Sequence, residues 1–302
     1  MNWRKWLFQL VVLPIAHLPT WARYGFSDFA AFVLRHVVKY RRKVIDANLA
    51  LAFPEKSSGE RKRIRNDFYT HFCDVALEQT WLFAADADEV TAVCKITNPE
   101  VPARFAGHGG LVSVCAGHYG NYEMAAATLG ITVPYPVCAI YTPLVNPYFD
   151  ERIRETRGKY GLLLWPKNQT KHLIKDWLAK EETFAVGFAT DQSPAAAAPK
   201  YWFPFLGEMT AHSRGVETYS RKHAAPVLFA WCDRVRRGVY TYTFRVVSED
   251  ASLEEPGAII KRQARILEEV IRREPANWLW SHRRWKLSLK RDLHERDVVL
   301  DD

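Results

Sequence analysis

His118 and Glu123 are the two side chains of this sequence best suited to acid–base chemistry. A carboxylate beside one nitrogen of an imidazole fixes the tautomer and raises the basicity of the other nitrogen, which can then accept a proton from a substrate hydroxyl. The sequence contains no G-x-S-x-G, H-E-x-x-H or P-loop motif. The nucleophile is therefore expected to come from the substrate rather than from the protein.

The residues between this pair fit a turn from a strand into a helix. Gly120 permits a tight turn, and Asn121 is a good N-cap for the helix that would follow. Glu123 would then lie in the first helical turn, where the helix dipole favours an ionised carboxylate. The same pattern also fits a structural role, in which His118 bonds a backbone carbonyl and Glu123 is an ordinary acid at a helix start.

Alternating strands and helices are expected to position the pair, because short apolar runs predict buried strands and longer amphipathic segments predict helices. The expected strands are 110–117, 137–141, 162–165, 184–190, 226–232 and 240–247. The expected helices are 60–83 (with Phe68, Phe72, Val75, Leu77 and Trp81 on its apolar side), 122–130, 147–160, 168–180, 212–223 and 256–274. This order predicts a single α/β domain over residues 46–302, with a mostly parallel, mixed sheet flanked by helices.

Asp191 and Gln192 form a second polar cluster at the end of an expected strand, the run FAVGFAT at 184–190. His118 likewise follows the expected strand at 110–117. Functional groups of α/β proteins gather at the carboxyl ends of the strands, so both clusters are candidates for one site. A purely structural turn is the alternative for Asp191 and Gln192.

The composition is that of an ordinary globular protein of 302 residues and 34.8 kDa, with 48% hydrophobic and 25% charged residues. It excludes a disordered chain and a collagen-like chain. The five cysteines lack C-x-x-C spacing and oppose a zinc site or a disulfide framework, so no metal is expected. The 11 tryptophans and 13 tyrosines suit positions with one wet end, as at a membrane interface.

Residues 1–45 are expected to form a membrane-associated helical segment before the α/β domain. The 17 residues from Trp6 to Ala22 carry no charge, but Pro14, His17 and Pro19 interrupt them. They predict a retained membrane anchor or an interfacial helix rather than an undisturbed spanning helix. A cleaved signal peptide and an ordinary buried helix are the alternatives, although no clear cleavage site precedes Arg23.

A second N-terminal stretch, 24–38, predicts a helix that lies on the cytoplasmic leaflet. It places Phe26, Phe29, Val33 and Val37 at helical spacing and leads into the basic run RHVVKYRRK. An apolar face beside a cationic cluster suits an anionic membrane surface, whereas the alternative is a core-packing helix with a solvated basic end. Residues 1–45 hold most of the formal net charge of +8, and the nearly neutral remainder opposes nucleic-acid binding.

Four motifs in order along the chain resemble those of the bacterial lipid A late acyltransferases, within the wider glycerolipid acyltransferase superfamily. GHYGNYE (117–123) resembles the family's G-H-x-G-N-W-E signature. YTPLVNPYFDERIRETRGKYG (141–161) resembles its Y-R-P-x-x-N segment with a downstream arginine and glycine. DQSP with YWFPFLG (201–207) resembles its D-Q block and aromatic segment, and PANWLWSHRRWK (275–286) resembles its closing W-x-H-R-R run.

The resemblance implies transfer of an acyl chain from acyl carrier protein or coenzyme A to a hydroxyl of a lipid A precursor. It implies a membrane-bound enzyme at the cytoplasmic face of the inner membrane, with the thioester as co-substrate and no other cofactor. His118 would be the general base and Glu123 the acid that orients it. The oxyanion would be stabilised by backbone N–H groups near Gly120 or by Arg157, with Arg154 as a neighbour.

The other matched residues carry less defined roles in this resemblance. Asp191 and Gln192 match the D-Q block and imply a positioning role, and the run His282-Arg283-Arg284 could bind phosphate or support the core. The family's Y-R-P arginine is Thr142 here, and Ser193 and Pro194 follow D-Q. These departures leave the acceptor open to a lysophospholipid or aminolipid. A non-catalytic membrane-surface protein of the same fold is the more distant alternative.

Overall fold

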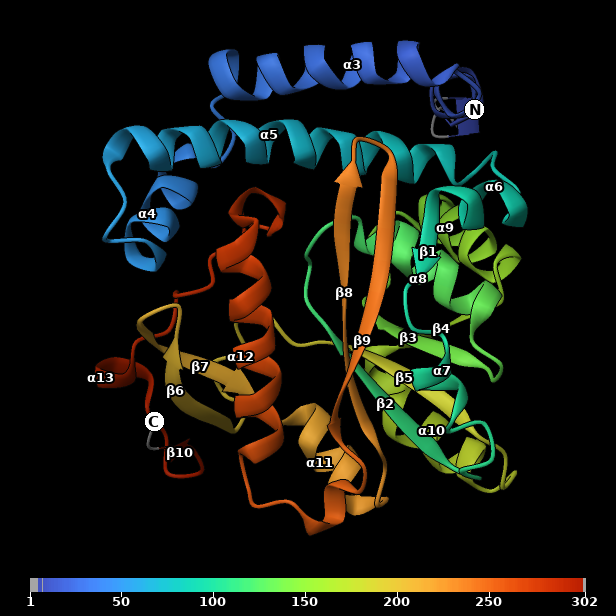
Figure 1. Ribbon diagram of the computed structural model, residues 1–302, viewed down its shortest axis with the longest axis vertical. Helices are drawn as coiled ribbons and strands as arrows, with labels where there is room; N and C mark the ends of the chain where they lie inside the picture. Colours follow the sequence, from blue (N-terminus) through green and yellow to red (C-terminus); the bar gives the residue numbers. More distant parts are fainter. Residues whose placement is uncertain (1–4, 7, 301–302) are drawn as a thin grey trace.

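A seven-stranded sheet forms the centre of the fold (Figure 1). The structure is a computed structural model and describes residues 5–6 and 8–300. The strand order is β1-β9-β8-β2-β5-β3-β4, and neighbours are parallel except in the antiparallel hairpin β8–β9. The strands are β1 (Cys94–Ile96), β2 (Leu111–Ala116), β3 (Val137–Tyr141), β4 (Leu162–Pro166), β5 (Phe184–Ala189), β8 (Val227–Arg236) and β9 (Val239–Ser248). The expected single α/β domain with a mostly parallel, mixed sheet flanked by helices is confirmed.

Helices cover both faces of this sheet, and alternate residues of each strand pack against them. In β2, Leu111 and Cys115 belong to one hydrophobic cluster, and Val112 and Val114 belong to the other. The first cluster includes α10 (Thr170–Leu178), α11 (Gly215–Lys222) and α12 (Ala258–Arg273), and the second includes α6 (Ala87–Val93) and α8 (Tyr122–Thr132). Because both faces are buried there, the inner strands β2 and β5 are apolar along most of their length, whereas β9 alternates.

A second, three-stranded sheet was not expected from the sequence. It consists of β6 (Lys200–Phe205), β7 (Glu208–Ser213) and β10 (Val298–Val299), in the order β10-β6-β7. Leu206 and Gly207 join β6 to β7 with φ angles of 53° and 83°, as a two-residue hairpin turn requires. The prediction of a helix over 212–223 is therefore wrong at its start, because β7 runs to Ser213 and α11 begins at Gly215.

The N-terminal residues form several short helices in place of one long one. They are η1 (Phe8–Val12), α2 (Leu13–Ala16), α3 (Thr20–Phe32), η2 (Val33–Val37) and α4 (Arg42–Ala52). Pro14 lies in the first turn of α2 and Pro19 is the N-cap of α3, so both prolines mark helix starts. Within the described residues, no helix has both the length and the apolar character needed to cross a bilayer. Arg4, part of the expected basic N-terminus, lies outside the described residues.

Helix α5 (Ser58–Trp81) runs across one end of the central sheet, and α3 lies alongside it (Figure 1). A capping box starts α5, in which Ser57 and Glu60 satisfy each other's backbone N–H groups. The side of α3 that carries Arg23, Ser27 and Ala31 is buried. Trp21, Phe26, Phe29 and Phe32 of the same helix have exposed side chains, whereas Tyr24 is partly buried.

Two further helices complete the surroundings of the site. Helix α9 (Pro147–Lys159) follows β3, and its N-cap is Asn146, whose side chain accepts a hydrogen bond from the backbone N–H of Tyr148. The short 3-10 helix η5 (Pro275–Asn277) follows α12 and contacts α5. The expected helices at 147–160 and 256–274 are thus confirmed, with ends that differ by one or two residues.

Candidate active site

The turn after β2 holds His118 in a tightly determined backbone. Gly120 has a φ of +61°, and a Cβ placed there would lie 1.8 Å from the carbonyl oxygen of Cys232 in β8. Only glycine therefore fits this position. The Asn121 side chain caps α8 by accepting a hydrogen bond of 2.9 Å from the backbone N–H of Met124. The predicted turn, N-cap and first-turn position of Glu123 are all confirmed.

Asp191 is the carboxylate that holds the His118 ring. Its Oδ1 lies 2.8 Å from His118 Nδ1, and its Oδ2 accepts a hydrogen bond of 2.8 Å from the His118 backbone N–H. Trp278 Nε1 donates a third hydrogen bond of 3.0 Å to Oδ2. The register between β2 and β5 explains why His118 and Asp191 meet. It pairs Ala116 with Ala189, the last residues of the two strands, and His118 and Asp191 each follow two residues later.

His118 and Asp191 shift each other's pKa in the directions that favour the charged form of each side chain. Burial tends to lower the pKa of His118, but the charge of Asp191, its hydrogen bond and the charge of Glu123 outweigh burial and raise that pKa above its usual value. Burial tends to raise the pKa of Asp191, but the charge of His118 and the donated hydrogen bonds lower it to about 2. Asp191 is thus ionised and accepts the Nδ1 proton, which leaves the lone pair of His118 Nε2 for a substrate.

Glu123 does not take the position expected of it. Its Oε2 accepts a hydrogen bond of 2.7 Å from Nη2 of Arg157 on α9, and both side chains are partly buried. The sequence suggested that Glu123 would contact one nitrogen of the His118 ring, but the carboxylate bonded to the ring, at Nδ1, is that of Asp191. Sequence spacing pointed to Glu123 because it is near along the chain, whereas the sheet brings Asp191 from a strand that follows much later.

The other predicted site residues lie at different distances from His118. Gln192 Nε2 is 3.4 Å from His118 Nε2, so it faces the nitrogen that would act as the base. Arg157 reaches the site through Glu123. Arg154, on the same helix, has an exposed side chain and its role stays a prediction. In the described part of the chain, no group of three or more His, Cys, Asp or Glu side chains is placed to hold a metal ion.

The segment 275–286 supports the His118 turn from the other side. The Leu279 backbone N–H donates to the carbonyl oxygen of His118, and Tyr119 forms a β-bridge with Trp278. Arg284 is buried and donates to the carbonyl oxygen of Ala211, which assigns it to the core rather than to a phosphate site. Trp278 is a site residue that sequence reasoning missed, although it lies within a motif that had been singled out.

A partly apolar hollow of about 150 Å³ opens beside His118. Phe68, Phe72 and Val75 of α5 line one side, and Trp278 and Leu279 line another. His118, Gly120 and Tyr122 border it as well. The structure therefore brings together the His118 imidazole, whose Nε2 contacts only the amide nitrogen of Gln192 among the hydrogen-bond partners in the described residues, and a space that can hold apolar atoms next to it.

The chain belongs to the bacterial lipid A biosynthesis acyltransferase family, whose model matches residues 1–287. It is accordingly an O-acyltransferase. It is similar to the lipid A biosynthesis lauroyltransferase of Escherichia coli K12, with 22% identity over 292 residues, which cover 94% of this chain and 92% of the relative. It is also 22% identical over 254 residues to the lipid A biosynthesis palmitoleoyltransferase of the same organism, which covers 83% of this chain and 81% of the relative.

Proposed function

We propose that this protein transfers an acyl chain from an acyl thioester to a hydroxyl of a lipid A precursor, with His118 as the general base. The observation that carries the proposal is the contact between His118 Nδ1 and Asp191, which leaves Nε2 beside the hollow as a proton acceptor. Acyl carrier protein or coenzyme A is the proposed carrier of the thioester. Family membership supports the acceptor, since the matching relatives act in lipid A biosynthesis.

The reaction needs one proton transfer in each direction. His118 Nε2 takes the proton of the acceptor hydroxyl while the oxygen attacks the thioester carbonyl carbon. The tetrahedral intermediate collapses by breaking the carbon–sulfur bond, and the imidazolium returns its proton to the leaving thiolate. The products are an ester and a free thiol, and His118 is neutral again. Asp191 stabilises the imidazolium while the ring holds the proton.

Arg157 is the proposed stabiliser of the oxyanion. The backbone N–H of Gly120 donates to the carbonyl oxygen of Asn277, and the backbone N–H of His118 donates to Asp191. These two N–H groups already donate hydrogen bonds within the protein, so they are not free to bind the oxyanion. Glu123 holds the guanidinium of Arg157 from α8, which gives the acid of the family motif a role other than orienting His118.

The test of this function is a comparison of lipid A from a host that lacks the protein and carries either an empty vector or the wild-type gene. We expect one acyl chain to be missing from the lipid A mass spectrum of the first strain and restored in the second. Unchanged lipid A in both strains would contradict the proposed acceptor. The same extracts would then be searched for an altered phospholipid or aminolipid, which are the alternative acceptors.

The outer face of α3 is the proposed contact with the cytoplasmic surface of the inner membrane. Trp21, Phe29 and Phe32 are 79%, 67% and 56% exposed, respectively, while the buried side of the helix carries small or polar residues. The arrangement opposes the alternative of a core-packing helix, because such a helix would bury its aromatic side. Exposed aromatic rings near basic residues suit the interface of an anionic bilayer.

Replacing Trp21 and Phe29 together by serine should weaken binding to anionic vesicles by about tenfold or more, because two large apolar side chains no longer enter the bilayer. Flotation of the full-length protein with vesicles of phosphatidylethanolamine and phosphatidylglycerol measures this binding. Leu253→Ser is the control, since it changes an exposed apolar side chain next to α11 instead of α3. Equal binding of the double variant and wild type would refute this contact.

A further inference from the structure

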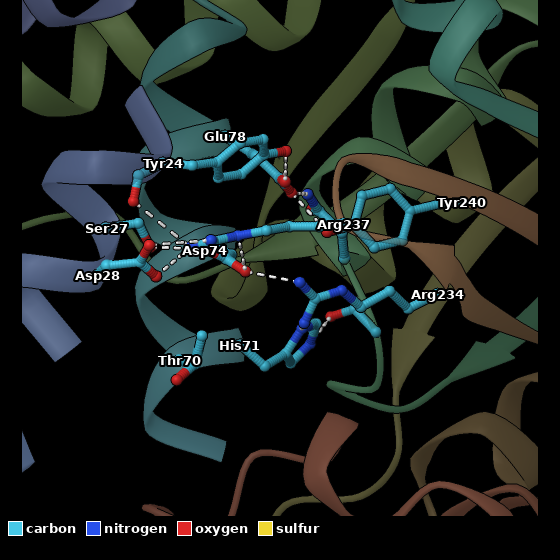
Figure 2. Close-up of polar contacts among 12 residues, drawn as sticks. Tyr24, Ser27, Asp28, Thr70, His71, Asp74, Glu78, Arg234, Arg237 and Tyr240 are labelled. Carbon is cyan, nitrogen blue, oxygen red and sulfur yellow. Dashed lines mark hydrogen bonds and ion pairs between the residues drawn. The ribbon is translucent and has the colours of Figure 1, made fainter. Parts of the chain in front are cut away.

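A buried polar cluster connects α3, α5 and the hairpin β8–β9, and Figure 2 shows most of its members. His71, Asp74 and Glu78 lie on one side of α5, at helical spacing, and all three are buried. Asp74 binds Arg234 and Arg237 of the hairpin segment, and also Ser27 of α3. The reaction proposed above uses none of these groups.

Glu78 accepts three hydrogen bonds, each of 2.6 Å. Tyr24 of α3 donates to Oε1, and Tyr240 of β9 and Asn121 donate to Oε2. Burial raises the pKa of the Glu78 carboxyl, and the three donated hydrogen bonds act in the opposite direction. A buried carboxylate with three donors from three separate elements holds those elements in one fixed arrangement.

The donor Asn121 links this cluster to the His118 turn. The Asn121 side chain is fully buried, and while its Nδ2 donates to Glu78, its Oδ1 caps α8 at Met124. His71 lies two helical turns before Glu78, and its Nε2 is 3.2 Å from the carbonyl oxygen of Gly120. His71 and Glu78 of α5 thus bond Gly120 and Asn121, two consecutive residues of the turn that begins with His118.

We propose that Glu78 is a positioning residue: it fixes the His118 turn through Asn121, and through Tyr24 it makes this geometry depend on the docking of α3. The proposal rests on the proposed function of His118. Helix α3 is then part of the support of the active site as well as the proposed membrane contact. A displacement of the turn moves the His118 backbone N–H and ring away from Asp191 at the same time, since both bond that carboxylate.

The main variants are Glu78→Leu and Glu78→Gln in the full-length protein. Leucine removes every acceptor, whereas the glutamine amide oxygen can still accept from Asn121 and should rescue part of the effect. We expect Glu78→Leu to lower kcat by about 10- to 100-fold with KM little changed, because small displacements of a base are costly. The backbone N–H of Met124 should exchange with solvent faster, since its acceptor Asn121 loses its own anchor.

The pH profile separates positioning from a general loss of folded protein. The charged and titratable groups around His118 are Asp191, Glu123 with Arg157, His282, and Tyr122, whose ring centroid lies 4.9 Å from that of His118. If the turn shifts, Asp191 supports the imidazolium less, the pKa of His118 falls, and the acid limb of kcat/KM moves to lower pH. A purely structural defect lowers the amount of active enzyme and leaves the limb where it is.

Tyr24→Phe and Ser27→Ala form a matched pair on α3. Each removes one hydroxyl that donates a hydrogen bond of 2.6 Å to α5, but only Tyr24 bonds Glu78, whereas Ser27 bonds Asp74. We expect faster exchange in the turn and a lower kcat for Tyr24→Phe, with wild-type behaviour for Ser27→Ala. If the two variants behave alike, the dependence of the turn on α3 through the bond between Tyr24 and Glu78 is overturned.

Acyl transfer from acyl carrier protein charged with a panel of saturated chains, together with amide hydrogen exchange of residues 117–130, provides the readouts. Unchanged exchange and kcat in folded Glu78→Leu would overturn the positioning role. If Glu78→Leu does not fold, the same two readouts on Glu78→Gln decide, and wild-type values there overturn the role. If the wild-type protein does not acylate the lipid A precursor, the proposed function is refuted. Amide hydrogen exchange does not depend on turnover, so it still tests whether Glu78 positions the turn.

Discussion

His118→Ala should reduce the rate of acyl transfer by about 10²–10⁴-fold, the usual contribution of a positioned general base. The substitution removes the nitrogen that accepts the hydroxyl proton, so the acceptor must attack as a neutral alcohol. The protein should remain folded, because the His118 ring is bonded by a single carboxylate at the edge of the hollow. The measurement is single-turnover acyl transfer from a charged acyl carrier protein to a lipid A precursor.

His172→Ala is a suitable control for this experiment, since it removes an exposed histidine from α10. It should retain wild-type rates. Thermal unfolding of both variants checks that the comparison is between folded proteins. Near wild-type turnover in His118→Ala would show that another group removes the proton, and the proposed mechanism would then be wrong.

Asp191→Asn is expected to have the second largest effect, a loss of about 10² or more in kcat/KM. An asparagine side chain keeps the shape but loses the charge that stabilises the imidazolium, and its amide group can hold the ring in the wrong tautomer. The same substitution changes the pH dependence. Activity requires neutral His118, so kcat/KM rises with pH through the pKa of this histidine.

The direction of the pH shift follows from the sign of the charges. Asp191 and Glu123 both raise the pKa of His118, and Asp191 contributes more. Removing the Asp191 charge therefore lowers this pKa, and the acid limb of the profile moves to lower pH. Glu123→Gln should produce a smaller shift and reduce kcat mainly by releasing Arg157. If Glu123→Gln moved the acid limb further than Asp191→Asn does, Glu123 would be the orienting carboxylate after all.

Local patterns predicted the turn of the site well. The buried run before His118, the glycine at position 120 and the N-cap Asn121 act over a few residues, so their effects can be read from neighbouring positions. The parallel sheet was predictable for a similar reason, because a helix between two successive strands is the usual crossover that lets them pair in parallel. The four ordered motifs led to the family that the comparison then established.

The apolar side expected for the helix at 60–83 was only partly correct. Phe68 and Val75 are buried, but Phe72, Leu77 and Trp81 are only partly buried. Polar residues at 71, 74 and 78 lie deeper, where they bond α3, the β8–β9 hairpin and the His118 turn. Hydropathy along α5 could not show this, because the partners that satisfy those groups lie far away in the sequence.

The sequence by itself determined the types of most elements, the turn that carries His118 and the chemical class of the site. Only the tertiary structure decided which side chains meet there. Asp191 bonds Nδ1 of His118, Glu123 accepts a hydrogen bond from Arg157, and Glu78 accepts one from Asn121. The physical reason is the range of the interactions. Capping, turn geometry and hydrophobic periodicity act between near neighbours, whereas the register of β2 on β5 and the packing of α3 on α5 arise from contacts between distant segments.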